Sequence, residues 1–186
     1  MPKFYLLFTV LFLFCSPFST SAGLDCPEKT VIKALSSEMD SFLAVAPLDF
    51  SQLKSAGALL RSQGKRLAVL LSNGSFSTAQ MADSFVLPIK KKSEFILAIN
   101  FSNGPDLIST GTYTPAAGYG KPFWVTAEVK LYKAEKGVIV SLGVAEGSAI
   151  ITLLDESRVC GSFDLKNRQG TSFASGEFNL PLETEK

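Results

Sequence analysis

Residues 161–180 are GSFDLKNRQGTSFASGEFNL, and the pentapeptide Gly161–Leu165 returns with two changes as Gly176–Leu180. In each copy, glycine, phenylalanine and leucine alternate with polar residues, which is the period-two pattern of a strand with one buried face. The polar stretch between the copies contains Gly170 and is typical of a turn. We therefore predict a hairpin whose two arms present phenylalanine and leucine to one core.

Apolar residues alternate with polar ones, or form short β-branched runs, in several other parts of the chain. In residues 123–132 the aliphatic side chains fall on one parity, and Trp124 falls on the other. Strands of this kind are predicted at Leu67–Leu71, Glu94–Phe101, Phe123–Tyr132, Val138–Leu142 and Ala149–Leu154.

Short strands separated by turns rich in glycine, proline, serine and asparagine indicate an all-β fold. We expect an antiparallel β-sandwich or barrel of short strands and hairpins. The segment before Leu67 is open to two interpretations. Ser62–Lys65 is a hairpin turn in the first, which the regular turn spacing elsewhere favours. In the second, Asp49 caps a short N-terminal helix from Phe50 to about Arg61, and Gly64 ends it.

The N-terminus has the composition of a secretory signal peptide. A basic start at Met1–Lys3 precedes the uncharged apolar run Phe4–Cys15, and Thr20–Ala22 offers small residues for cleavage. We expect residues 1–22 to be removed and residues 23–186 to form a single β-rich domain, exported to the periplasm or the extracellular space. No later apolar stretch approaches the roughly 20 residues that a membrane-spanning helix needs, so no membrane span is expected in the mature chain.

Export also bears on the cysteines. Cys15 belongs to the signal peptide, which leaves Cys26 and Cys160 as an even pair in an oxidising compartment. We predict that they form a disulfide.

The chain contains no histidine, which excludes the Ser-His-Asp and Cys-His catalytic systems and the histidine-containing zinc sites. No motif for a phosphate, a metal or a cofactor occurs, so neither a metal nor a cofactor is expected. The formal net charge of +1 argues against a nucleic-acid partner, which usually requires a strongly basic face.

One segment, Gly111–Trp124 (GTYTPAAGYGKPFW), concentrates four aromatic residues, three glycines and two prolines. Tyr113, Tyr119 and Trp124, together with Tyr132 on the same strand face as Trp124, are the candidate residues for binding a ligand or partner. The sequence favours the other interpretation, in which a second sheet or a loop covers this face and makes Trp124 part of the core.

Asn73-Gly-Ser75 and Asn100-Phe-Ser102 match the acceptor pattern for N-glycosylation. If the source is eukaryotic, Asn73 and Asn100 are candidate glycosylation sites.

These observations favour an exported, non-catalytic β-domain that binds an unknown protein or glycan at the cell envelope or outside the cell. We expect no enzymatic activity. One alternative is a structural or assembly subunit that uses an edge strand as its contact surface. A more remote alternative is a histidine-free hydrolase, which would need two carboxylates about 5–10 Å apart in a cleft.

Overall fold

The computed structural model describes residues 26–35, 53–82, 89, 94–131, 144, 146–167 and 172–185. One short α-helix, α2 (Thr78–Ala82), and two 3-10 turns, η1 (Ser62–Gly64) and η2 (Pro115–Ala117), lie among the described strands. The strands are β1 (Val31–Leu35), β2 (Ser55–Arg61), β3 (Arg66–Ser72), β4 (Phe95–Ser102), β5 (Gly111–Tyr113), β6 (Trp124–Leu131), β7 (Glu146–Leu154), β8 (Arg158–Lys166) and β9 (Ser172–Thr184).

All nine strands belong to one sheet in the order β5-β7-β8-β9-β2-β3-β4-β6, and β1 pairs with β9. Of the described pairs, β2 with β9 is parallel and the others are antiparallel. The two ends of this order meet at Thr114, directly after β5, which bridges to Trp124 at the start of β6. The sheet is therefore nearly closed into a barrel, and the predicted all-β fold class is confirmed.

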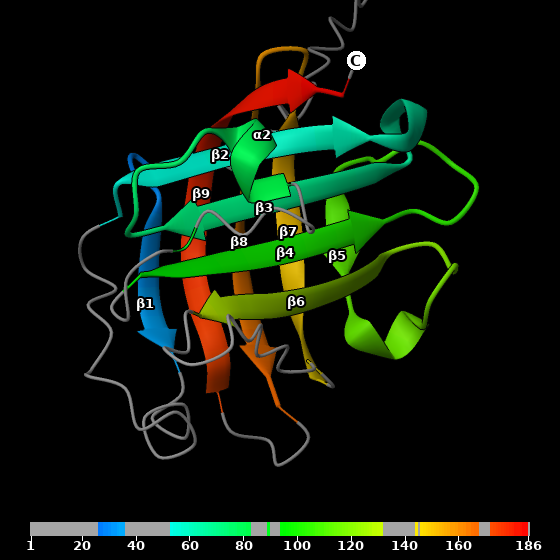
Figure 1. Cartoon of the computed structure of the whole chain (residues 1–186). Coiled ribbons are helices and arrows are strands. Elements are labelled where there is room, and N and C mark those ends of the chain that lie inside the picture. Colours follow the sequence, from blue (N-terminus) through cyan, green and yellow to red (C-terminus); the bar gives the residue numbers. More distant parts are fainter. Residues whose placement is uncertain are drawn as a thin grey trace, which may run out of the picture.

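The barrel is flattened into two layers whose strands cross steeply, with β2, β3, β4 and β6 in front of β7, β8 and β9 (Figure 1). Crossed layers of this kind bury the inward-facing residue of every second position. The core between them includes Leu67, Leu71, Phe95, Leu97, Ile99, Phe101, Tyr113, Val125, Phe163 and Phe178.

The repeated pentapeptides form the antiparallel pair β8–β9, as predicted. Gly161 pairs with Phe178, and Phe163 pairs with Gly176, so each glycine faces the phenylalanine of the other copy. A methyl group on Gly161 would lie closest to the carbonyl oxygen of Ile150 and 2.6 Å from Cζ of Phe178. One on Gly176 would lie closest to the carbonyl oxygen of Val31 and 2.7 Å from Cζ of Phe163. The repeat is therefore a packing device, in which each aromatic ring covers the glycine of the neighbouring strand.

The segment before β3 is a hairpin arm, as the preferred interpretation predicted, because residues 55–61 form β2 rather than a helix. β2 and β3 pair from Ser55 with Ser72 to Arg61 with Arg66. In the connecting turn, Ser62, Gln63 and Gly64 have φ values of 52°, 55° and 86°. Left-handed backbone of this kind matches the twist of paired strands and closes tight hairpins.

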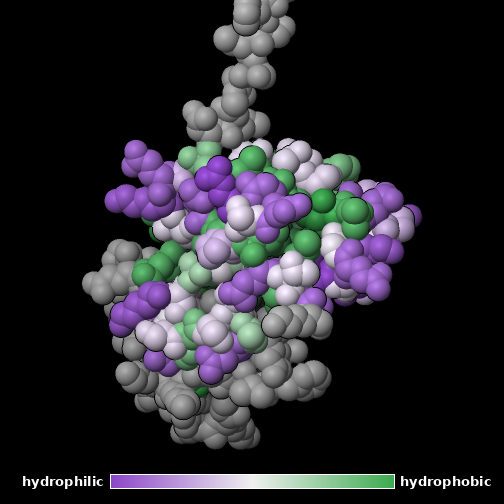
Figure 2. Space-filling model, turned by 90° about the horizontal axis from the view of Figure 1, so that it is seen from above, coloured by the Kyte–Doolittle hydropathy of each residue, from purple (hydrophilic) through white to green (hydrophobic). Residues whose placement is uncertain are grey.

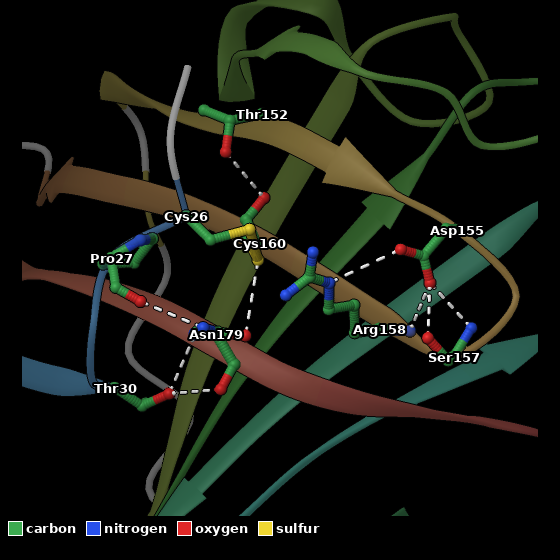
Figure 3. Close-up of a disulfide and its surroundings, with 9 residues drawn as sticks. All are labelled: Cys26, Pro27, Thr30, Thr152, Asp155, Ser157, Arg158, Cys160 and Asn179. Carbon is green, nitrogen blue, oxygen red and sulfur yellow. Dashed lines mark hydrogen bonds and ion pairs between the residues drawn. A yellow bond between two sulfur atoms is a disulfide. The ribbon is translucent and has the colours of Figure 1, made fainter. Parts of the chain in front are cut away.

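The predicted disulfide between Cys26 and Cys160 is present, with a Cα–Cα distance of 5.4 Å (Figure 3). It fixes the segment before β1 to β8, and Asn179 on β9 adds hydrogen bonds to the same segment. The Asn179 side-chain amide donates to the carbonyl of Pro27 at 3.0 Å. The Asn179 backbone exchanges hydrogen bonds of 2.9 and 3.0 Å with the hydroxyl of Thr30.

One end of the outer face of the front layer is covered. Ala68, Leu70, Ile96 and Ala98 form a second apolar cluster there, under Ile89 and Phe76. Toward the other end of the same strands, the outward residues are polar or aromatic, and that end carries the candidate site.

The predicted signal peptide of residues 1–22 and the predicted return strand Val138–Leu142 lie outside the described residues, as does Tyr132. Within the described part of the chain, no helix combines the length and the apolar character that crossing a membrane would require.

Candidate functional site

A row of four residues crosses the outer face of the front layer: Arg61, Arg66, Ser102 and Trp124. They lie at the ends of β2, β3, β4 and β6 that are on the right in Figure 1. The strand register pairs Arg61 with Arg66, Arg66 with Ser102, and Ser102 with Trp124. Their chain neighbours Leu67, Phe101 and Val125 lie in the core, so alternation directs this row away from it.

The next row along the same face contains Ala68, Asn100 and Thr126, each paired with its neighbour across β3, β4 and β6. Asn100 and Thr126 are half-buried. An aromatic and cationic row is thus followed by a neutral hydrogen-bonding row.

The loop between β5 and β6 brings Tyr119 to this surface. Its two ends are tied together, because Thr114 donates its backbone N–H to the carbonyl of Phe123 at 2.8 Å. Gly118 and Gly120, on either side of Tyr119, have φ values of 85° and 76°, which L-residues rarely adopt. No heavy atom lies within 4 Å of a Cβ built at either glycine. The glycines are therefore required for the backbone path and not for space.

Tyr119 and Trp124 form an edge-to-face pair, with ring centroids 5.3 Å apart and an interplanar angle of 87°. The Tyr119 side chain is 75% exposed, and Trp124 is half-buried. Arg66 donates from Nη2 to the Tyr119 hydroxyl at 3.4 Å. Trp124 is thus accessible on the outer face, in contact with a loop residue and outside the core.

These residues line a cleft of about 450 Å³. Sites for small ligands span roughly 300–1,000 Å³, so the volume suits a ligand of one or a few rings. Seen from above, the molecule mixes hydrophilic and hydrophobic residues across the visible face (Figure 2). Among the described residues, the exposed large hydrophobic side chains are Leu107, Tyr119 and Phe123. The cleft is therefore a better candidate than a broad apolar surface.

The two arginines of the cleft differ in whether a carboxylate neutralises them. Arg61 forms an ion pair with Glu185, with Nε 3.3 Å from Oε1, and the backbone N–H of Ser62 donates to Oε2 at 3.4 Å. Arg66 has no carboxylate partner among the described residues. Two guanidinium groups against one carboxylate leave the cleft lining with a net charge of +1.

The structure separates the four aromatic residues that the sequence singled out. Tyr119 and Trp124 lie together at the cleft, and Tyr132 lies outside the described residues. Tyr113 is instead fully buried, with its ring 5.2 Å from that of Phe101. Its hydroxyl donates to the carbonyl of Ser109 at 2.8 Å and accepts the Ser109 N–H at 3.2 Å. Because β5 turns this side chain into the core, we exclude Tyr113 from the surface site.

Sequence reasoning missed Arg61, Arg66 and Glu185, which come from β2, β3 and the chain after β9. No local motif marks them, and their proximity follows from strand register. A register prediction for the β2–β3 hairpin, with its turn at Ser62–Lys65, would have placed the two arginines opposite each other.

The two glycosylation candidates differ in their surroundings. Asn100 lines the cleft, so a glycan attached there would occupy it. Asn73 accepts the backbone N–H of Phe95 at 2.9 Å through its side-chain oxygen. Glycosylation of either residue stays a prediction.

Acidic residues do not gather into a cation site within the described residues, where no group of three or more potential metal ligands occurs. Of the described residues that line the cleft, Glu185 carries the only carboxylate. The adjacent Asp155 and Glu156 form the turn between β7 and β8, in which Asp155 donates its N–H to the carbonyl of Arg158 at 3.0 Å.

Comparison with protein-family models, with curated proteins and with solved structures finds no match to this chain.

Proposed function

We propose that the protein is an exported, non-catalytic binding domain and that it holds its ligand in the cleft beside Tyr119 and Trp124. The observation that carries this proposal is the exposed edge-to-face aromatic pair next to Arg66, whose charge no described carboxylate balances. Aromatic faces supply contact area at little entropic cost, and a guanidinium supplies directed hydrogen bonds.

The scaffold supports the same function. Arg61, Arg66, Ser102 and Trp124 sit on four hydrogen-bonded strands, so their backbones are held in place before any ligand arrives. A binding site on paired strands loses little conformational entropy when it is occupied. The predicted export and the disulfide between Cys26 and Cys160 are consistent with a role outside the cytoplasm.

The fluorescence of the single tryptophan provides the test, because emission reports on Trp124 alone. The protein purified after export is titrated with a panel of neutral oligosaccharides, acidic oligosaccharides and short peptides. We expect at least one class to shift or quench the emission in a saturable manner.

The matched variants are Tyr119→Ala, in the cleft, and Leu107→Ala, an exposed apolar residue that does not line it. Loss of one aromatic contact is expected to weaken binding about tenfold. Leu107→Ala should bind as the unchanged protein does. If no panel member alters Trp124 emission and the protein instead associates with itself in sedimentation, the structural-subunit hypothesis is favoured.

A further inference from the structure

We propose that the ligand of the cleft is a sugar carrying a carboxylate, a uronic acid unit, with its carboxylate on Arg66 and its ring against Trp124. This inference rests on the binding function proposed above and adds the chemical class of the ligand. It follows from the difference between the two arginines, from the neutral groups beside them and from the geometry of the aromatic pair.

Arg66 has hydrogen-bonding capacity to spare. A guanidinium carries five N–H donors in a planar fork. Among the described residues, the side chain of Arg66 makes one hydrogen bond, to the Tyr119 hydroxyl, at the long distance of 3.4 Å. A carboxylate can accept two parallel hydrogen bonds from such a fork, which makes it the natural partner for this side chain.

Arg61 already has a carboxylate partner, Glu185, which limits how much negative charge the cleft can take. Its partner Glu185 is held in place by its own backbone N–H, which donates to the carbonyl of Leu60 at 2.9 Å. Glu185 therefore neutralises Arg61 and repels a second anion. The cleft is suited to one carboxylate at a time and not to a densely charged polyanion.

The neutral groups of the cleft favour a sugar over other carboxylates. Asn100 and Thr126, one row below Arg66 and Trp124, offer an amide and a hydroxyl that can pair with ring hydroxyl groups. The ring of Trp124 offers an apolar surface to the C–H groups of a sugar face.

The same geometry argues against a flat aromatic acid. The rings of Tyr119 and Trp124 are nearly perpendicular, at 87°, so this pair provides no two parallel ring faces between which an aromatic ligand could be sandwiched. A puckered ring with hydroxyl groups on its rim fits the corner between two perpendicular rings.

The test compares acidic sugars with their own neutral forms. The probes are the hyaluronate disaccharide and single mannuronate and galacturonate units, each with one carboxylate and each beside its carboxyl-reduced counterpart, with Trp124 emission measured at low salt. We expect at least one acidic probe to bind about tenfold or more tightly than its reduced form. Added NaCl should reduce that preference, because the ion pair is exposed to solvent.

Three variants test whether Arg66 causes the preference for the acidic probe. Arg66→Gln should bind the acidic and the reduced form of a probe equally. Glu185→Gln should bind the acidic form more tightly than the unchanged protein, because it removes the competing carboxylate and frees Arg61. Arg158→Gln is the matched control, since this exposed arginine begins β8 and does not line the cleft.

Two results would overturn the inference, and they differ from a failure of the proposed function. If acidic and reduced probes bind equally, and Tyr119→Ala weakens the binding of both, the cleft is a binding site but the carboxylate plays no part in recognition. Absence of binding for every acidic probe, when a peptide from the broader panel does bind, would keep the cleft as a site and exclude a uronic acid as its ligand. Absence of binding for the whole panel would reject both proposals.

Discussion

Asp164 and Asn179 occupy equivalent positions in the two copies of the repeat, but they make different contacts. Asp164 is exposed on β8. Asn179 lies against the disulfide, with its side-chain oxygen 3.4 Å from Sγ of Cys160, and its amide donates to the carbonyl of Pro27 (Figure 3). An aspartate could not make that donation, because an ionised carboxylate is only an acceptor. Asn179 can therefore anchor the N-terminal segment through its amide, whereas an aspartate at this position could not.

Exchanging these two side chains tests the assignment at the residue scale. Asn179→Asp leaves the Pro27 carbonyl without its donor, which should lower the free energy of unfolding by about 1–2 kcal/mol. The reverse change, Asp164→Asn, is the control and should alter it by less than about 0.5 kcal/mol. Denaturant unfolding of the oxidised protein measures both. Equal effects for the two variants would contradict the anchoring role of Asn179.

At the scale of elements, the turn between β7 and β8 is organised by one carboxylate. The backbone N–H and the hydroxyl of Ser157 both donate to Asp155 at 2.8 Å, and the backbone N–H of Arg158 donates at 2.9 Å. Because these bonds favour the ionised form, with those of Ser157 contributing most, they lower the pKa of Asp155 to about 2.

This shift has a defined pH dependence. A pKa that is lower in the folded chain than the ordinary value of about 3.9 stabilises the fold above that value. The contribution is lost as the pH falls through about 2. NMR titration should find the Asp155 midpoint near 2. Ser157→Ala should raise the midpoint, whereas Ser175→Ala, a remote change on β9, should leave it unchanged. A midpoint unaffected by Ser157→Ala would show that the hydroxyl does not contribute.

At the scale of the whole molecule, β9 connects the parts of the barrel. It pairs with β8 along one edge and, along the other, with β1 and then β2. The disulfide joins the segment before β1 to β8, across a sequence separation of 134 residues. Residues 26–35, the first described part of the chain, are thus held to β8 by the disulfide and to β9, the last strand, by strand pairing.

Removing the disulfide should therefore be costly. The chain-entropy argument gives a loop of this length roughly 5 kcal/mol at most, and measured values are commonly about 2–4 kcal/mol. We expect the double variant Cys26→Ser/Cys160→Ser to lose about 2–4 kcal/mol of unfolding free energy, measured by denaturant unfolding. Reductant should lower the unfolding free energy of the unchanged protein by the same amount, and it should leave that of the double variant unchanged. A loss below about 0.5 kcal/mol would mean that the hydrogen bonds of Asn179 hold the segment without the covalent bond.

Much of the fold could be predicted because its signals are local. Alternation along Arg158–Lys166 reports one buried face, since successive side chains of a strand point to opposite sides of the sheet. The choice of partner strand is different, because it depends on contacts between residues far apart in the chain. The parallel pairing of β2 with β9 and the bridge from Thr114 to Trp124 leave no local signal.

The candidate site could be predicted only in part, for the same reason. Tyr119 and Trp124 stand out in a loop with an unusual composition, but so does Tyr113, which β5 places in the core. Alternation shows that the strands of Tyr113 and Trp124 each have two faces, one for every second residue. It does not show which side is inner until the neighbouring strands are in place.

The sequence by itself determined the β class, the hairpin of the repeated pentapeptide and the pairing of Cys26 with Cys160. These follow from period-two patterning, from turn composition and from the count of cysteines. Tertiary structure alone decided that Arg61, Arg66 and Glu185 would meet beside Trp124, and that Arg66 would be the guanidinium without a described carboxylate partner. The physical reason is that strand register sets which residues lie side by side, and register is fixed by the packing of the whole barrel.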